Sequence, residues 1–229
     1  MATSPQNPPT VLVKAEEPAR LRTLLRRVYN WLAAADPVSN ADMIFALAGR
    51  RSRKLYVLRL FDEGRAPRIL LSTGRFEIRR FSDLSLPLPV DLMRIASLIP
   101  PPQRHFFVCF EGQQVEVKRI PVRRFGTLGE IQALADWLHD RPRIKSLAII
   151  SSGPHLRRVR MCCRAVLPEQ LQLRLMAVPE ESQWLNARSW WREWSALSLV
   201  LSEVLKLLLY QVVLAPSSIR RILFHNHPV

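Results

Sequence analysis

Residues 148–160 read Ala-Ile-Ile-Ser-Ser-Gly-Pro-His-Leu-Arg-Arg-Val-Arg, an apolar run that passes through small hydroxyl residues and a histidine into an arginine-rich stretch. This order predicts a buried parallel strand that leads into a loop and the N-terminus of a helix. Backbone N–H groups in the first turn of a helix have no partner within the helix and attract negative charge. The stretch therefore predicts a site for an anionic ligand. The side chains that would add donors to this site are Ser151, Ser152, His155, Arg157 and Arg158.

Two earlier stretches show the same order of apolar run, small residue and glycine. Residues 41–49 end at Gly49, and residues 68–74 end at Gly74. Neither run alternates strictly between apolar and polar residues, which is typical of central strands in a parallel sheet. An amphipathic helix between the two runs completes a βαβ unit, a motif that is right-handed in nearly all proteins.

Periodicity and turn residues predict the other elements. Helices are expected over residues 19–35, near 90–97, directly after the Thr127–Glu130 segment, and over 196–215. Another helix is expected to begin within the 148–160 stretch and to continue to about residue 167. Strands are expected over residues 105–110, 114–120, 146–150 and 172–178, with the first two joined in a hairpin around Glu111-Gly112. Thr127 and Glu130 have the spacing of a capping box, in which each side chain caps the start of the helix.

This order of elements predicts an α/β fold. We expect a three-layer α/β/α sandwich with a Rossmann-like, mostly parallel sheet and a long hydrophobic C-terminal helix. The 229 residues and 48% hydrophobic content suit a single domain with a sizeable core. Residues 1–18 are expected to be a flexible lead-in, 19–214 the α/β domain and 215–229 a tail. Within the domain, residues 75–126 form a variable region that contains the hairpin.

The chain is strongly basic, with a formal net charge of +15. This charge favours anionic partners, namely phosphorylated small molecules, nucleic acid or an anionic membrane surface. A genome that favours arginine explains the same charge without any partner. No recognisable nucleic-acid-reading motif occurs in the sequence, so a specific nucleic-acid partner is not expected.

The three cysteines are Cys109, Cys162 and Cys163. Their number and spacing indicate neither a disulfide framework nor a zinc site. Free thiols fit a reducing compartment, and no secretory signal is recognisable, so we expect the protein to be cytoplasmic. His225 and His227 are a weak metal pair near the end of the chain, and no metal site is predicted.

Residues 196–215 are long enough to cross a bilayer. Glu203 and Lys206 fall near the centre of this segment, where each charge costs about 2.5–3.5 kcal/mol to insert. Because they are three residues apart, they lie on one face of a helix and can pair. We therefore expect a helix that packs on the sheet or lies peripherally on the inner face of the cytoplasmic membrane, and a true span is the alternative.

With these elements placed, the sequence resembles the bacterial DUF218 family, which includes the YdcF-, ElyC- and SanA-like proteins. The resemblance covers residues 42–210. Ser151-Ser152-x-x-His155-x-x-Arg158 is similar to the family's Thr-Ser-x-x-His-x-x-Arg signature. The other matching pieces are residues 41–44 leading to Gly49, residues 60–72, Thr127-Leu128-Gly129-Glu130, and Glu203-x-x-Lys206 on a hydrophobic helix.

The resemblance implies a three-layer sheet with a charged pocket at the strand ends. It also implies a link to cell-envelope or murein biogenesis for some members. The chain departs from the family in having fewer glycines, with Ala48-Gly49-Arg50 in the first loop and Ser72-Thr73-Gly74 in the second. Fewer glycines leave less room for the backbone to approach a phosphate closely. An amide expected soon after Glu130 is also missing.

In an open α/β sheet, ligands bind beyond the carboxyl ends of the strands, near a switch in strand order. The candidate ligand-binding residues at these ends are Gly49, Arg50, Ser72, Thr73, Gly74, Thr127, Ser151, Ser152 and Arg158. Arg157 and Arg158 point about 100° apart on a helix, so only one of them should face the pocket. The resemblance favours Arg158.

The candidate catalytic residues are His155 and Glu130. His155 is either a general acid or base, or a residue that orients the loop and binds phosphate without proton transfer. Glu130 is either a base in the pocket or only the capping residue of its helix. Ser72 and Ser151 lack the strained turn of a serine-hydrolase nucleophile, so serine hydrolysis is not expected.

The leading hypothesis is a protein that binds an anionic, phosphate-bearing ligand. That ligand would be a nucleotide-like cofactor such as S-adenosylmethionine or an envelope precursor such as a lipid-linked phosphate. A hydrolase or transferase activity would use His155 for acid–base chemistry. The alternatives are an envelope-associated binding or regulatory protein without turnover, and a nonspecific nucleic-acid-binding protein.

Overall fold

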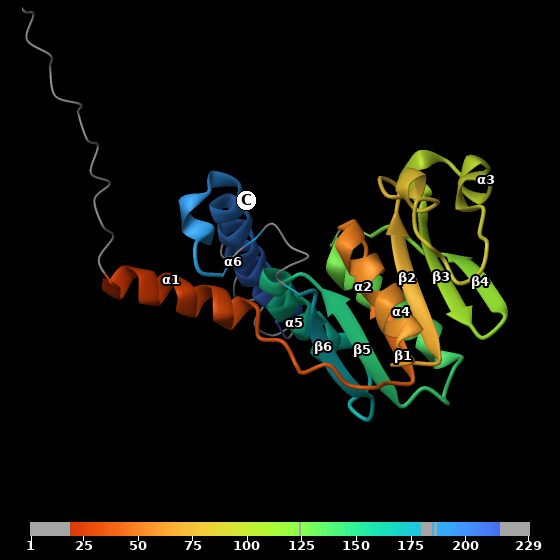
Figure 1. The fold of residues 1–229 in the computed structure, drawn as a ribbon, viewed down its shortest axis with the longest axis horizontal. Helices are drawn as coiled ribbons and strands as arrows, with labels where there is room; N and C mark the ends of the chain where they lie inside the picture. The colour runs from red at the N-terminus through yellow and green to blue at the C-terminus, as the bar shows by residue number, and fades with distance from the viewer. Residues whose placement is uncertain (1–18, 124, 180–184, 186, 216–229) are drawn as a thin grey trace, which may run out of the picture.

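The computed structural model describes residues 19–123, 125–179, 185 and 187–215, and the fold is mixed α/β (Figure 1). The expected lead-in (1–18), nearly all of the expected tail and the His225/His227 pair lie outside the described residues. The helices are α1 (Ala19–Leu32), α2 (Arg51–Asp62), α3 (Leu92–Ser97), α4 (Gly126–His139), α5 (Leu156–Val166) and α6 (Trp194–Leu214). The strands are β1 (Met43–Ala46), β2 (Arg68–Gly74), β3 (His105–Glu111), β4 (Gln114–Arg119), β5 (Ser146–Ser151) and β6 (Gln172–Ala177).

The six strands form one sheet in the order β4-β3-β2-β1-β5-β6. Strand β1 lies at its centre and pairs in parallel with both β2 and β5, placing Phe45 opposite Leu70 and Ile149. Strand β6 is parallel to β5, whereas β3 is antiparallel to β2 and β4 is antiparallel to β3. The chain moves from β1 to β2 on one side and reaches β5 on the other, so the strand order switches beside β1.

Helices cover both faces of the sheet, because each central strand is apolar on both sides. On β1, Met43 and Phe45 join a core cluster with α4 and α5, whereas Ile44 and Ala46 join a second cluster with α2 and α3. All four residues of this strand are fully buried. A strand that is buried on both faces has apolar residues at successive positions, and this explains why apolar and polar residues do not alternate in the runs that predicted the central strands. The expected three-layer α/β/α architecture is confirmed.

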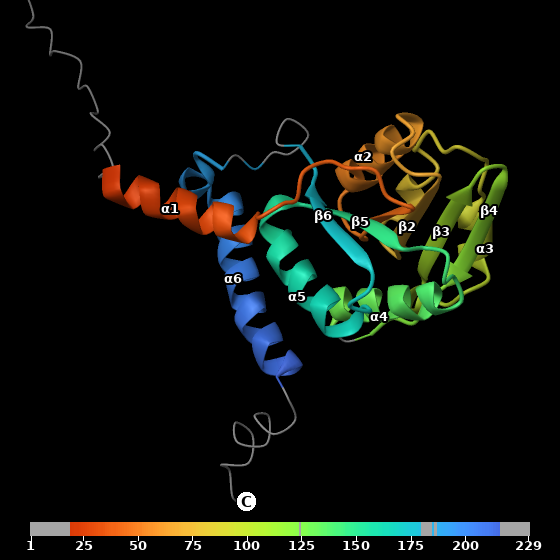
Figure 2. The ribbon, with the colours of Figure 1, turned by 90° about the horizontal axis from the view of Figure 1, so that it is seen from below.

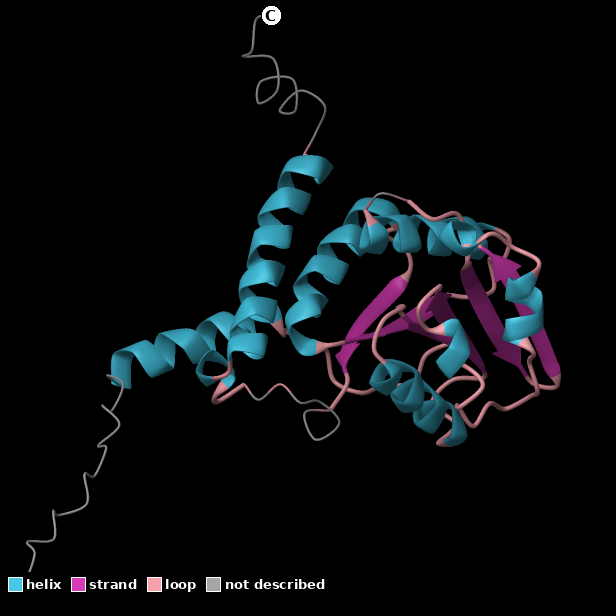
Figure 3. Cartoon of the chain, turned by 90° about the horizontal axis from the view of Figure 1, so that it is seen from above, coloured by secondary structure: helices cyan, strands magenta, loops and turns pink. Residues whose placement is uncertain are grey.

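Helices α1 and α6 form a separate group at the β6 edge of the sheet. They pack on each other and on a short turn around Trp190 through a third apolar cluster that includes Leu32, Val200 and Leu207. Both helices lie beyond α5, and α1 extends away from the sheet (Figures 2 and 3). The long C-terminal helix of the sequence analysis is therefore mainly packed on other helices and not on the sheet.

The sequence placed most elements within a few residues of their ends, including the β3–β4 hairpin around Gly112, which has a φ of +55°. The first strand is shorter than the apolar run that predicted it. It ends at Ala46, and the chain then turns through Gly49, which has a φ of +123°. This left-handed conformation favours glycine, so the run from residue 41 to 49 contains both a strand and the loop that follows it.

Replacing Phe107 with alanine should strongly destabilise the fold. Its ring is 1% exposed and makes an edge-to-face contact with Phe45, with the ring centres 5.4 Å apart. Loss of a buried phenylalanine typically lowers the free energy of unfolding by about 3–5 kcal/mol. The matched control is Phe76→Ala, because Phe76 is 82% exposed. Urea unfolding should show a change within about 0.5 kcal/mol for this control, and equal losses in the two variants would contradict the packing.

Candidate functional site

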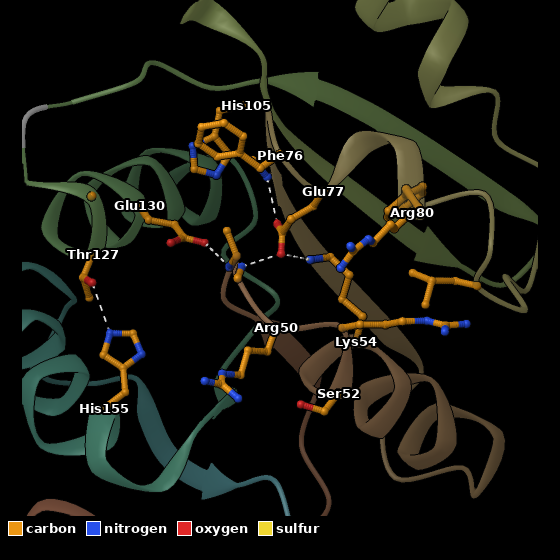
Figure 4. Close-up of a pocket in the computed structure, with 17 residues that line it drawn as sticks. Arg50, Ser52, Lys54, Phe76, Glu77, Arg80, His105, Thr127, Glu130 and His155 are labelled. Carbon is orange, nitrogen blue, oxygen red and sulfur yellow. Dashed lines mark hydrogen bonds and ion pairs between the residues drawn. The ribbon is translucent and has the colours of Figure 1, made fainter. Parts of the chain in front are cut away.

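A cavity of about 790 Å³ opens at the carboxyl ends of β1, β2 and β5. This is the edge of the sheet where strand order switches and where ligands bind in open α/β folds. Its charged lining residues are Arg50, Arg51, Lys54, Glu77, Arg80 and Glu130, and its histidines are His105 and His155 (Figure 4). A smaller adjoining cavity of about 230 Å³ reaches toward α6.

Glu77 accepts hydrogen bonds from backbone amides at the ends of two neighbouring strands. Its carboxylate accepts hydrogen bonds from the N–H of Gly49 at 2.5 Å and of Gly74 at 3.0 Å (Figure 4). Lys54 Nζ lies 3.1 Å from the same carboxylate, and its side chain is 3% exposed. Burial lowers the pKa of Lys54, and the charge of Glu77 opposes that shift. Two amides and an ammonium that would suit a phosphate oxygen are thus already bound to a carboxylate of the protein.

Glu130 projects from α4 into the same region and binds the loop after β1. Its Oε1 accepts a hydrogen bond of 2.7 Å from the N–H of Ala48. Burial raises the pKa of Glu130, against the lowering effects of a hydrogen bond from Ser72, the Ala48 amide and the charges of Arg53 and Lys54. A buried carboxyl group with a raised pKa beside a cavity is a candidate for proton exchange with a ligand.

The capping-box interpretation of Thr127 and Glu130 is wrong. Helix α4 begins at Gly126, Phe125 is its N-cap, and no side chain caps it. Thr127 therefore lies within the first turn, and its hydroxyl contacts His155, while Glu130 reaches across to Ala48. Both side chains form hydrogen bonds with other elements and do not cap their own helix, because they point from the start of α4 toward the loops after β1 and β5.

His155 is held between hydroxyl groups and cations. Its Nδ1 lies 2.8 Å from Ser151 Oγ and 3.3 Å from the guanidinium of Arg53, and its Nε2 lies 3.2 Å from Thr127 Oγ1. Because a guanidinium only donates, this contact favours the tautomer in which Nδ1 accepts and Nε2–H donates to Thr127. Burial, and then the charges of Arg53, Arg158 and Lys206, lower the pKa of His155 well below its usual value. His155 is therefore neutral at neutral pH.

Arg53 supports the loops behind His155 without lining the main cavity. Its guanidinium donates to Ser152 Oγ at 3.0 Å and to the carbonyl of Ala48 at 2.6 Å, and so ties the loop after β5 to the loop after β1. Burial lowers the pKa of Arg53 to about 10, so the group remains charged at neutral pH.

Arg158 is bound within the protein and not free for a ligand of the main cavity. It makes a two-pronged ion pair with Glu203 of α6, at 2.9 and 3.0 Å, and also donates to Thr127 Oγ1. Lys206 lies 3.1 Å from the same Glu203 carboxylate. The expected pairing of Glu203 with Lys206 is confirmed, and Arg158 reaches only the smaller cavity. Arg157 points elsewhere, stacking on Trp31.

The structure brings together most, but not all, of the residues that the sequence proposed. Those that line the main cavity are Gly49, Arg50, Gly74, Thr127, Glu130 and His155, and Ser152 and Arg158 line the smaller one. Ser72, Thr73 and Ser151 line neither cavity and are fully buried. Ser151 is the last residue of β5, and Ser72 and Thr73 directly precede Gly74, the last residue of β2. Helices cover both faces of these strands, and it is Gly74 and Ser152 that reach the cavities.

His105, at the start of β3, is a site residue that the sequence analysis missed. Its Nε2 lies 2.9 Å from Ser72 Oγ, and Ser72 in turn hydrogen-bonds Glu130. Burial lowers the pKa of His105 to about 4. The chain of contacts from His105 through Ser72 links a lining histidine to the buried carboxylate. Pairing of β2 with an antiparallel β3 puts them together, and no local pattern in the sequence indicates that pairing.

No family model, curated protein or solved structure matches the chain. Among the described residues, no group of three or more histidine, cysteine and carboxylate side chains is placed to hold a metal ion. The three cysteines are buried free thiols. The interpretation of the site therefore rests on its own geometry and charges.

Replacing Glu203 with leucine should lower the free energy of unfolding by about 3–5 kcal/mol, because it leaves the buried Arg158 guanidinium without a counter-charge. The double variant Arg158→Met/Glu203→Leu removes both charges and should recover most of this loss. Urea unfolding of the two variants and the wild type measures the difference. A single variant that loses less than about 1 kcal/mol would contradict a buried pair of this kind.

Protonation of His105 should contribute to unfolding in mild acid. Its pKa is lowered from 6.5 to about 4 in the fold, so between these values the unfolded chain binds a proton that the folded chain does not. The contribution of neutral His105 to the free energy of unfolding is therefore fully present above pH 6.5, and it is lost as the pH decreases toward 4. His105→Gln should show a smaller fall over this range, and the exposed His139→Gln should match the wild type. Identical pH profiles for all three proteins would be the contrary result.

Proposed function

We propose that the cavity binds an anionic, phosphate-bearing ligand at the N-terminus of α2. The observation that carries this proposal is the excess of positive charge there. Arg50, Arg51 and Arg80 line the cavity, while Glu77 is already paired with Lys54. Helix α2 begins in this wall with no side-chain cap. In its first turn the amide of Arg53 already donates to the carbonyl of Arg50, and the amides of Arg51 and Ser52 add to the arginines in attracting an anion.

The outer wall of the cavity supports a ligand with a ring or another apolar part. Phe81 and Leu84 belong to this apolar lining, and so does Phe76, which is 82% exposed and is labelled in Figure 4. An aromatic ring that is already exposed can stack on a second ring and bury apolar area in doing so. A nucleotide-like molecule, with phosphates toward α2 and a base toward Phe76, fits both walls better than inorganic phosphate does.

A second candidate is turnover of that ligand, and Glu130 is the observation that favours it. Its raised pKa, its burial and its place in the lining suit a proton donor or acceptor. His155 is less suited to donating a proton, because burial and then the surrounding cations lower its pKa and keep it neutral. Release of orthophosphate from a nucleoside diphosphate, abolished by Glu130→Gln, would support a hydrolase. Binding without release would support the non-catalytic alternative.

Kinship with the DUF218 family, and through it a role in bacterial cell-envelope biogenesis, is part of the same proposal. Its support is the order of the motifs along the chain, in particular Ser151-Ser152-x-x-His155-x-x-Arg158. A cytoplasmic location is proposed from the buried, unpaired thiols of Cys109, Cys162 and Cys163, which fit a reducing compartment.

ADP is a suitable probe for the proposed site, and Arg50→Met should weaken its binding. A hydrogen bond to a charged group contributes about 1.5–3 kcal/mol, which corresponds to a loss of affinity of about tenfold or more. Calorimetric titration measures the affinity, and the thermal shift produced by saturating ADP provides an independent reading.

The matched control for this experiment is Arg79→Met. Arg79 is exposed and lies on the same segment as the cavity residues Glu77 and Arg80, but it does not line the cavity. The control removes the same charge and should bind ADP like the wild type. Equal weakening in both variants would indicate a nonspecific charge effect, and unaltered affinity in Arg50→Met would contradict the proposed site.

A further inference from the structure

Helix α6 exposes a continuous apolar stripe on the side opposite its packed face. Leu201, Leu205, Leu208 and Leu209 are 56%, 69%, 56% and 49% exposed, and Trp194 at the start of the helix is 80% exposed. Their spacing of three and four residues puts them on one side of the helix. Only 22% of the most apolar window of this helix is buried. Large exposed apolar patches mark surfaces that bind a partner or a membrane.

Helix α1 adds a second amphipathic surface at the same end of the molecule. Leu21, Leu24 and Trp31 are 42%, 56% and 47% exposed. The helix packs against α6 through the apolar cluster that contains Tyr29 and Leu32, so the two exposed surfaces belong to one edge of the fold (Figures 2 and 3).

The exposed charged side chains within these two helices are all basic, although the exposed Glu193 directly precedes Trp194. Helix α1 carries Arg20, Arg22, Arg26 and Arg27, and no acidic residue occurs between Ala19 and Leu32. The one acidic residue of α6, Glu203, is buried against Arg158, while Lys206 is 47% exposed. An amphipathic helix with arginines on its polar face and leucine and tryptophan on the other is typical of proteins that bind at the surface of an anionic bilayer.

The packed face of α6 argues against a transmembrane orientation, although this helix is long and apolar enough to cross a bilayer by length and composition. Glu203 is bound to Arg158 of α5 and is 7% exposed, and Val200, Leu207 and Tyr210 are buried with it. To span the bilayer, α6 would have to leave these partners and place the Glu203 carboxylate in the hydrocarbon. Lying in the plane of the interface keeps the ion pair and buries the leucines.

We propose that α1 and α6 dock the protein onto the surface of an anionic lipid bilayer. The stripe Trp194/Leu201/Leu205/Leu208/Leu209 enters the boundary between headgroups and acyl chains, and the arginines of α1 contact lipid phosphates. The proposal is independent of the ligand of the cavity. It does have a consequence for the cavity, because Glu203 on the inner face of α6 holds Arg158, and Arg158 holds Thr127 in the cavity lining.

Sedimentation of the full chain with vesicles tests this proposal. Vesicles that contain phosphatidylglycerol should bind the wild type, and pure phosphatidylcholine vesicles should bind it much more weakly. Leu205→Gln/Leu208→Gln should lower the partition coefficient at least about tenfold, since it removes two leucines from the apolar contact. Arg26→Gln/Arg27→Gln should also weaken binding, and its residual binding should depend less on salt, because surface charge is screened by salt.

The control variants lie at the far end of the sheet, on and beside α3. Leu98→Gln changes a leucine that is 83% exposed, and Arg94→Gln removes an exposed arginine; both should bind vesicles like the wild type. All of the side chains changed in the stripe and arginine variants are exposed, so we expect their melting temperatures to equal that of the wild type. Equal melting temperatures would show that these variants are folded.

Three outcomes would overturn the proposal. The first is a failure of the vesicle assay: either the wild type does not bind, or the stripe variant binds as strongly as the wild type. The second is a wild-type protein that stays with bacterial membranes after extraction with alkaline carbonate, which would indicate a span. The third is a wild-type dimer in sedimentation velocity that becomes a monomer in the stripe variant without any vesicle binding. That third result would assign the stripe to a second copy of this chain.

Discussion

The buried ion pair between Arg158 and Glu203 holds the cavity and the terminal helices together. Arg158 belongs to α5, Glu203 to α6, and the same guanidinium donates to Thr127 at the start of α4. Desolvating two charges is costly, and here the cost is offset by the bidentate contact, by the hydrogen bond from Arg158 to Thr127 and by Lys206 beside Glu203. Removing either partner would leave a buried charge, so α6 is tied to the sheet by a polar contact as well as by its apolar face.

A second constraint follows from the carboxylates that fill the loops at the strand ends. Glu77 takes the amides of Gly49 and Gly74, and Glu130 takes that of Ala48. In glycine-rich loops these amides are free to surround a phosphate. Here they bind side chains of the protein and stabilise the loops, so an anion in the cavity would meet arginine side chains of the lining and not these amides.

The sequence predicted the parallel core and the hairpin because these depend on local patterns. Continuous apolar runs, turn residues and helical spacing all act within a few positions, and they placed β2, β3, β4 and β5 closely. The contacts of Glu77 and His105 escaped prediction, since each joins residues that are distant in sequence: Gly49 to Glu77 across 28 positions and Ser72 to His105 across 33. The capping-box interpretation of Thr127 and Glu130 was wrong for a related reason. Their spacing fits a local cap, but the partners that they bind come from other helices, strands and loops.

The charges around His155 link its protonation to occupancy of the cavity. Burial and then Arg53, Arg158 and Lys206 lower its pKa, so the neutral imidazole is the stable form of the empty site. An anion in the cavity adds a negative charge near the same ring and opposes the three cations. Linkage requires that a ligand which raises this pKa binds more tightly when His155 is protonated. Burial and then these cations keep His155 neutral in the free protein, and an anionic ligand that offsets the cations would raise its pKa.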